Sequence, residues 1–113
     1  MNRNELYHVY NRGNNKETIF FTERNYKHFL NLYDKYLKDY AKLYSHCLMP
    51  NHFHLFIRIK DLRWLEEDEL SKKVSQQFRV LFMSYSKGFN KEHNRTGSLF
   101  QKNFKRKLVD TES

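Results

Sequence analysis

The stretch Leu48-Met49-Pro50-Asn51-His52-Phe53-His54-Leu55-Phe56-Ile57-Arg58-Ile59 decides the fold of this chain. In an extended strand, successive side chains point to opposite faces, so residues 53, 55, 57 and 59 share one apolar face. Residues 52, 54, 56 and 58 share the other face, which begins with two histidines. The apolar face is suited to packing under helices, and the histidine face is then left open.

The two histidines of this stretch are a candidate metal site. His52 and His54 lie on one face of the predicted strand, about 6–7 Å apart at the backbone. Both imidazoles can then converge on one divalent cation, since imidazole is a common metal ligand. A partly solvated polar face explains the same two residues without a metal, so the pair alone leaves both interpretations open.

Length and charge limit the class of protein. The 113 residues are enough for one domain with its own core, and we expect a single domain over residues 1–113. The 21 lysines and arginines outnumber 13 acidic residues and give a net charge of +8, which favours a polyanionic partner such as nucleic acid. A basic protein without such a partner has the same composition.

The single cysteine, Cys47, excludes an internal disulfide and is compatible with a reducing compartment. The sequence has no apolar run of the length of a membrane span and no signal peptide at its N-terminus. We therefore expect a cytoplasmic protein with no membrane partner.

The rest of the sequence predicts three further strands and two helices. Aromatic and β-branched residues predict a first strand over 6–11, which turn residues then end. Apolar residues at helical spacing predict helices over about 23–40, after the N-cap Thr22, and over about 67–91. The other two strands are predicted over 43–48 and 99–109.

The resulting order is strand, helix, strand, strand, helix, strand. This order is typical of an α+β, ferredoxin-like fold, in which a four-stranded antiparallel sheet carries both helices on one face. His52 and His54 then project from the opposite, uncovered face. Their exposure favours a functional site over core packing.

Three blocks of the sequence, in the right order, resemble the single-tyrosine HUH transposases, in particular the REP-associated tyrosine transposases and their insertion-sequence relatives. The blocks are Tyr7-His8-Val9-Tyr10-Asn11-Arg12-Gly13, Met49-Pro50-Asn51-His52-Phe53-His54 and Asn94-Arg95-Thr96-Gly97-Ser98-Leu99-Phe100-Gln101. The resemblance implies a homodimer that binds single-stranded or hairpin DNA and cuts one strand with a tyrosine, which becomes linked to the 5′ phosphate. It also implies that His52 and His54 hold Mg²⁺ or Mn²⁺ on the scissile phosphate.

The nucleophile is where the resemblance is incomplete. In that family the tyrosine lies on a further helix, four residues before an Asn or Gln that is the third metal ligand. Here only Tyr7, with Asn11, has that spacing, and both lie on a predicted strand. Tyr85 is the remaining catalytic candidate, but it falls on the apolar stripe of its helix, where a core tyrosine is the alternative. We therefore expect a chain that ends before the nucleophile helix, and its enzymatic activity stays open.

Basic residues near these blocks are the candidates for DNA contacts: Arg12, Arg58, Arg95, Lys102, Lys105 and Arg106. Over residues 99–109, basic and aromatic residues alternate in a way that can follow a phosphate backbone. An edge strand protected by lysines explains the same alternation.

Three functions remain open at this point. The first is a metal-dependent transposase domain, and the second is a DNA-hairpin-binding module left without cleavage activity. The third is an unrelated metal-binding or RNA-binding ferredoxin-like domain. The RNA-binding version lacks the expected stacking aromatics, because the open face is predicted to carry histidines.

Overall fold

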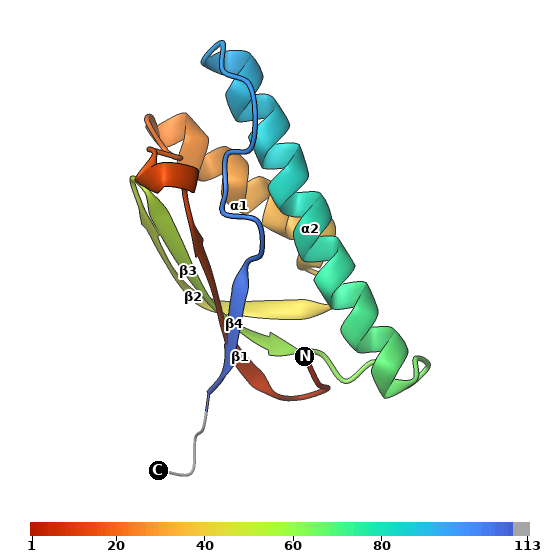
Figure 1. Cartoon of the computed structure of the whole chain (residues 1–113). Helices are drawn as coiled ribbons and strands as arrows, with labels where there is room; N and C mark the ends of the chain where they lie inside the picture. Colours follow the sequence, from red (N-terminus) through yellow and green to blue (C-terminus); the bar gives the residue numbers. More distant parts are fainter. Residues whose placement is uncertain (110–113) are drawn as a thin grey trace.

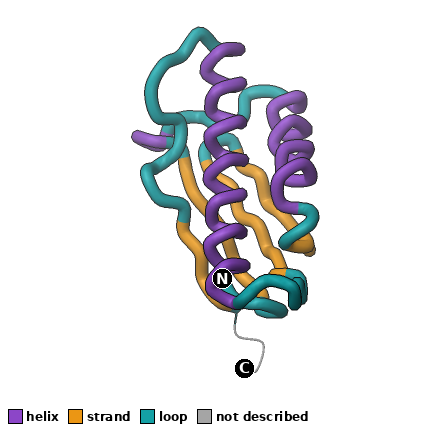
Figure 2. Tube along the Cα trace, turned by 90° about the vertical axis from the view of Figure 1, so that its right-hand side faces the viewer, coloured by secondary structure: helices purple, strands orange, loops and turns teal. Residues whose placement is uncertain are grey.

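A computed structural model describes residues 1–109 of the chain. Its elements are β1 (Leu6–Arg12), a short 3-10 helix η1 (Asn14–Lys16), α1 (Glu23–Leu37), β2 (Ala41–Met49), β3 (His52–Ile59), α2 (Glu67–Glu92) and β4 (Lys105–Leu108). The strands lie in the order β2-β3-β1-β4, and each neighbouring pair is antiparallel. Both helices cover one face of this sheet (Figures 1 and 2). The predicted α+β, ferredoxin-like architecture is confirmed.

Strand β3 lies between β1 and β2 and separates the two faces of the sheet. Its apolar residues Phe53, Leu55, Ile57 and Ile59 are fully buried. The ring of Phe53 packs against Phe29 of α1 and Phe82 of α2, with ring centroids 5.1 and 5.3 Å apart. The intervening side chains of β3 are half-buried or exposed, as the alternation predicted, and they form the open face of the sheet.

The first helix begins at the predicted residue, Glu23, but ends at Leu37, earlier than predicted. Thr22 caps it, because its hydroxyl accepts from the backbone N–H of Asn25 while the Asn25 side chain accepts from the backbone N–H of Thr22. The predicted extension to residue 40 is wrong, because Tyr40 turns back onto the carbonyl of Leu37 and the chain enters β2 at Ala41. Within residues 1–109, no helix has both the length and the apolar character needed to cross a bilayer.

Strand β2 contains a β-bulge that the sequence did not predict. Leu43 pairs with Ile57 and Ser45 pairs with Phe56, so Tyr44 is an extra residue between them. Its exposed ring lies near Lys42 and Arg58, 5.2 and 5.8 Å from their charged groups. The bulge therefore adds an exposed aromatic ring to the open face.

The last predicted strand, over residues 99–109, is mostly wrong. Only Lys105–Leu108 form β4, and before it a single bridge joins Phe100 to Gly13. Leu99 and Phe100 are both buried although they are consecutive, which a strand with one open face does not allow. Phe104 packs against α2, so residues 97–104 run along that helix before they reach the sheet (Figure 1).

The division of β3 into two faces predicts unequal losses of stability when two phenylalanines on this strand are replaced. Phe53→Ala should lower the free energy of unfolding by about 3–5 kcal/mol, because it leaves a cavity in the core. Phe56→Ala, on the open face, should cost only about 1 kcal/mol because it removes ring stacking alone. Urea denaturation followed by circular dichroism measures both, and equal losses would contradict the assigned faces.

Candidate metal and nucleic-acid site

The open face of the sheet carries a cleft around the two histidines. It is lined by Tyr10, Asn11, Arg12, Lys16, Asn51, His52, His54, Gln101 and Lys105. The strand register brings these residues together: Arg12 is opposite His52, and Tyr10 is opposite both His54 and Lys105. Residues directly opposite each other in antiparallel strands share a face. The cleft is therefore assembled from β1, β3 and β4, the turn before β3, η1 and the segment before β4, and we call it the histidine cleft.

His52 is oriented by its neighbour in the turn. Its Nδ1 lies 2.8 Å from the side-chain oxygen of Asn51. An amide oxygen only accepts hydrogen bonds, so His52 Nδ1 carries the proton and its Nε2 keeps a free lone pair. The rings of His52 and His54 are 5.2 Å apart and nearly perpendicular, which is close enough for both to reach one ion.

His54 has a second histidine as its partner. Its Nδ1 lies 2.7 Å from Nε2 of His8, on the neighbouring strand β1. One of the two nitrogens donates to the other, and only donation from His54 leaves His54 Nε2 free for a metal. The His8 ring is stacked against Phe56 and Tyr10, with centroids 4.6 and 4.4 Å away. His8 was not among the predicted site residues, although it alternates with Tyr10 and Arg12 in the first of the three sequence blocks.

The surroundings of His54 and His8 favour the neutral form of both rings. Burial lowers the pKa of His54, and the nearby imidazole of His52 lowers it further. Burial likewise lowers the pKa of His8, with smaller effects from His54 and Lys107. Both rings are therefore neutral at neutral pH, which is the form in which imidazole binds metals.

The donors of the histidine cleft fit a divalent metal held by two imidazole nitrogens. Within residues 1–109, no group of three or more His, Cys, Asp or Glu side chains is placed to hold a metal. The described lining of the cleft also contains no carboxylate, and it contains three cations, Arg12, Lys16 and Lys105. Two neutral ligands leave the charge of a divalent ion uncompensated, so the remaining coordination positions favour an anion such as phosphate.

The other predicted DNA-binding residues are distributed over several surfaces. Arg58 is on the open face, at the far end of β3 from the histidines. Lys102 is exposed on the segment before β4, and Arg106 points toward α2, where it donates to Ser75 at 3.3 Å. The six predicted residues therefore do not form one patch.

Arg95 is tied into the loop that follows α2. It pairs with Glu17 and donates to the side chain of Asn90 and the carbonyls of Gly97 and Ser98. These contacts account for Arg95 without DNA, and its role in DNA binding stays a prediction.

Tyr85 lies in the core, on the side of the sheet away from the histidines. It is fully buried, its ring packs against Phe20 and Phe29, and its hydroxyl donates to the carbonyl of Ile19. Burial raises the pKa of Tyr85 far above its usual value, with smaller effects from Glu92 and Tyr26. This placement does not favour Tyr85 as a nucleophile.

Tyr10, which the sequence did not single out, is the tyrosine that lines the histidine cleft, with its ring 5.8 Å from that of His54.

The open face also carries more aromatic rings than expected. Tyr44 is 53% exposed and Phe56 is 37% exposed, and both share the open face with the stacked rings of His8 and Tyr10. The prediction that this face lacks stacking aromatics is therefore wrong. Such rings can stack on the bases of a single-stranded nucleic acid.

Comparison with solved structures identifies proteins with this fold. One is a REP-associated tyrosine transposase bound to a REP hairpin, with a TM-score of 0.66 and 13% identity over 96% of this chain and 58% of the other. Another is a protein from Deinococcus radiodurans R1 assigned as a transposase, with a TM-score of 0.59 and 16% identity over 94% of this chain and 79% of the other. No protein-family model and no curated protein matches the sequence. At these identities the similarity establishes a shared fold, and this chain spans little more than half of the first transposase.

The geometry of the three histidines predicts how the chain binds metal. On titration with Mn²⁺, the imidazole NMR signals of His52 and His54 should broaden before those of His28, His46 and His93, which lie outside the cleft. His8→Phe keeps a ring for stacking but removes the acceptor for His54 Nδ1, so it should weaken Mn²⁺ binding about tenfold. Uniform broadening of all histidines would contradict the site, and an unchanged affinity in His8→Phe would contradict the role of His8.

Proposed function

We propose that this chain is a transposase-like protein that binds single-stranded or hairpin DNA and holds one phosphate at His52 and His54 through Mg²⁺ or Mn²⁺. The observation that supports this most is the pair of oriented imidazoles in a cleft whose described lining has three cations and no carboxylate. A site that holds a metal for structural reasons supplies all of its ligands itself. Here the cleft leaves charge compensation to a bound anion.

The choice of DNA as the partner rests on two further observations. The fold is shared with a transposase bound to a REP hairpin, and three sequence blocks resemble the single-tyrosine HUH transposases. A homodimer and the formation of a 5′-phosphotyrosine link belong to the proposal through that resemblance.

Several residues in and around the cleft have roles in this proposal. A bound metal would polarise the phosphoryl oxygen and neutralise part of its charge. Asn51 and His8 orient the two ligating rings, and Arg12 and Lys105, on β1 and β4, attract the adjoining DNA backbone. The exposed rings of Tyr44 and Phe56 are available for base stacking.

A second candidate function is a DNA-hairpin-binding module that does not cleave. The burial of Tyr85 favours it, and so does the finding that, within residues 1–109, no third His, Cys, Asp or Glu joins His52 and His54 in a group placed to hold a metal. Binding without chemistry needs only the cationic cleft and the aromatic face. The two functions share the same DNA-binding surface and differ in whether a covalent product forms.

Metal-dependent DNA binding tests the proposal. Addition of Mn²⁺ should tighten binding of a fluorescein-labelled hairpin with a single-stranded tail about tenfold, or ~1.4 kcal/mol, for one new phosphate contact. His52→Ala combined with His54→Ala should remove this gain, while His46→Ala, on the edge strand β2, should leave it intact. Fluorescence anisotropy with and without EDTA measures the difference. Equal binding in both buffers would contradict the proposed site.

A covalent-adduct assay distinguishes the two candidate functions, because only the cleaving transposase forms a covalent product with DNA. After incubation of labelled hairpin DNA with Mn²⁺, a denaturing gel should show the same products for Tyr85→Phe as for the unaltered chain, because the Tyr85 hydroxyl is buried. Any adduct formed by this chain should depend on Tyr10, which lines the cleft. A covalent band that disappears in Tyr85→Phe but persists in Tyr10→Phe would overturn this assignment.

A further inference from the structure

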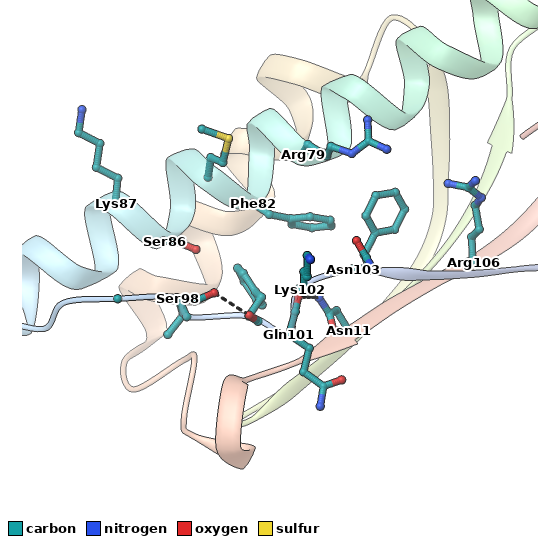
Figure 3. Close-up of a pocket in the computed structure, with 15 residues that line it drawn as sticks. Asn11, Arg79, Phe82, Ser86, Lys87, Ser98, Gln101, Lys102, Asn103 and Arg106 are labelled. Carbon is teal, nitrogen blue, oxygen red and sulfur yellow. Dashed lines mark hydrogen bonds between the residues drawn. The ribbon is translucent and has the colours of Figure 1, made fainter.

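A groove lies between α2 and the segment 97–106, beside the sheet. It has a volume of about 740 Å³ and is formed by one side of α2, at residues 79, 82, 83, 86 and 87, together with the facing segment. These helix positions recur at intervals of three and four residues, so they form one continuous stripe. Figure 3 shows the stripe and the segment facing each other across the groove. We call this the α2 groove.

The charges around the α2 groove are all positive. Arg79, Lys87, Lys102 and Arg106 belong to its lining, and none of the fifteen lining residues is acidic. Among the described residues, none of these four cations takes part in an ion pair. Unpaired like charges around a concave surface attract an anionic chain.

The groove also offers apolar surface between these cations. Met83 is 71% exposed and Phe104 is half-buried, whereas the other apolar lining residues, Phe82, Leu99 and Phe100, are buried. A small inorganic anion would use the cations and leave this surface uncovered. A polymer that alternates phosphates with flat bases would use both, as in other single-strand binding grooves.

The α2 groove adjoins the histidine cleft. Asn11 and Gln101 line both of them. The side chain of Asn11 is buried and donates to the carbonyl of Gln101 at 3.0 Å, which joins β1 to the segment before β4. A DNA strand with one phosphate in the histidine cleft can therefore pass over these two residues into the α2 groove.

We propose that the α2 groove binds the single-stranded DNA that adjoins the phosphate held in the histidine cleft. The inference rests on the proposed function, because the DNA reaches the groove from that cleft. Phosphates lie against Arg79, Lys87, Lys102 and Arg106, and bases lie against Met83 and the edges of Phe82 and Phe104.

Binding in EDTA isolates the groove from the metal site. Arg79→Ala combined with Lys87→Ala should weaken binding of a labelled oligothymidine of about 12 nucleotides severalfold. The slope of log K against log salt should fall by about 1.4 units, or about 0.7 for each phosphate that the protein no longer neutralises. The matched control is Lys72→Ala combined with Lys91→Ala, which removes two exposed lysines of α2 outside the groove. An equal weakening in the control would overturn the inference.

A second variant tests the α2 groove without changing any lysine or arginine. Met83→Glu places a carboxylate at an exposed helix position, so the fold is retained while the groove acquires a repulsive charge. It should weaken DNA binding at least as much as the double variant. Unchanged binding in Met83→Glu would overturn the inference, and circular dichroism confirms that the variant is folded.

Photocrosslinking locates the strand directly. Oligothymidine with 5-iodouracil at successive positions should crosslink to peptides that contain Met83 or Phe104, identified by mass spectrometry. Crosslinks only to β2 and β3 would overturn the groove assignment. Tighter binding of the matching RNA oligonucleotide, with the same crosslinks, would assign the groove to RNA and overturn the choice of DNA.

The metal experiment separates this inference from the proposed function. If Mn²⁺ still tightens hairpin binding through His52 and His54 but the groove variants behave as the control, the groove inference fails alone. If the Mn²⁺ gain is absent while the groove variants still weaken binding, the proposed metal site fails and the groove assignment stands on the crosslinks.

Discussion

The alternation of side chains along β3 is the constraint on which the rest of the structure depends. Because β3 lies between two other strands, its apolar face can be covered only by the helices, and its polar face must remain open. A shift of one residue in register would bury His52 and His54 and expose Phe53 and Leu55. The same alternation therefore stabilises the fold and presents the histidines to solvent.

The arrangement of the open face depends on the residues that lie next to His52 and His54. Asn51 orients one imidazole, and His8 contacts the other from the adjacent strand. Asn51 is held by a backbone hydrogen bond from Gly13 and His8 by ring stacking, so both imidazoles are oriented before any ligand arrives. The described lining of the cleft contains three cations and no carboxylate, which suits an anionic ligand. This electrostatic arrangement distinguishes the cleft from a site that holds a metal on its own.

The sequence predicted those features that depend on local periodicity. The faces of β3, the two helices and the exposure of His52 and His54 all follow from spacings of two or of three and four residues. It missed the late start of β4, because the ring of Phe100 packs against both Phe82 of α2 and Phe53 of β3, and Leu99 beside it is buried as well. It also missed His8 and Tyr10, because their positions beside His54 depend on the register between β1 and β3. Register is set by side-chain packing along both strands, and no single stretch of sequence encodes it.

Asn11 shows how this non-local packing also joins the two concave surfaces. Its amide nitrogen donates to the carbonyl of Gln101, and its amide oxygen accepts from the backbone N–H of Arg12. A buried amide that is satisfied at both ends holds its partners firmly, since breaking either bond leaves a buried polar group unpaired. The segment before β4 is thereby fixed against β1 at the point where the histidine cleft meets the α2 groove. A single strand that follows both surfaces meets a path that is already ordered, so less of the binding free energy is lost in arranging the protein.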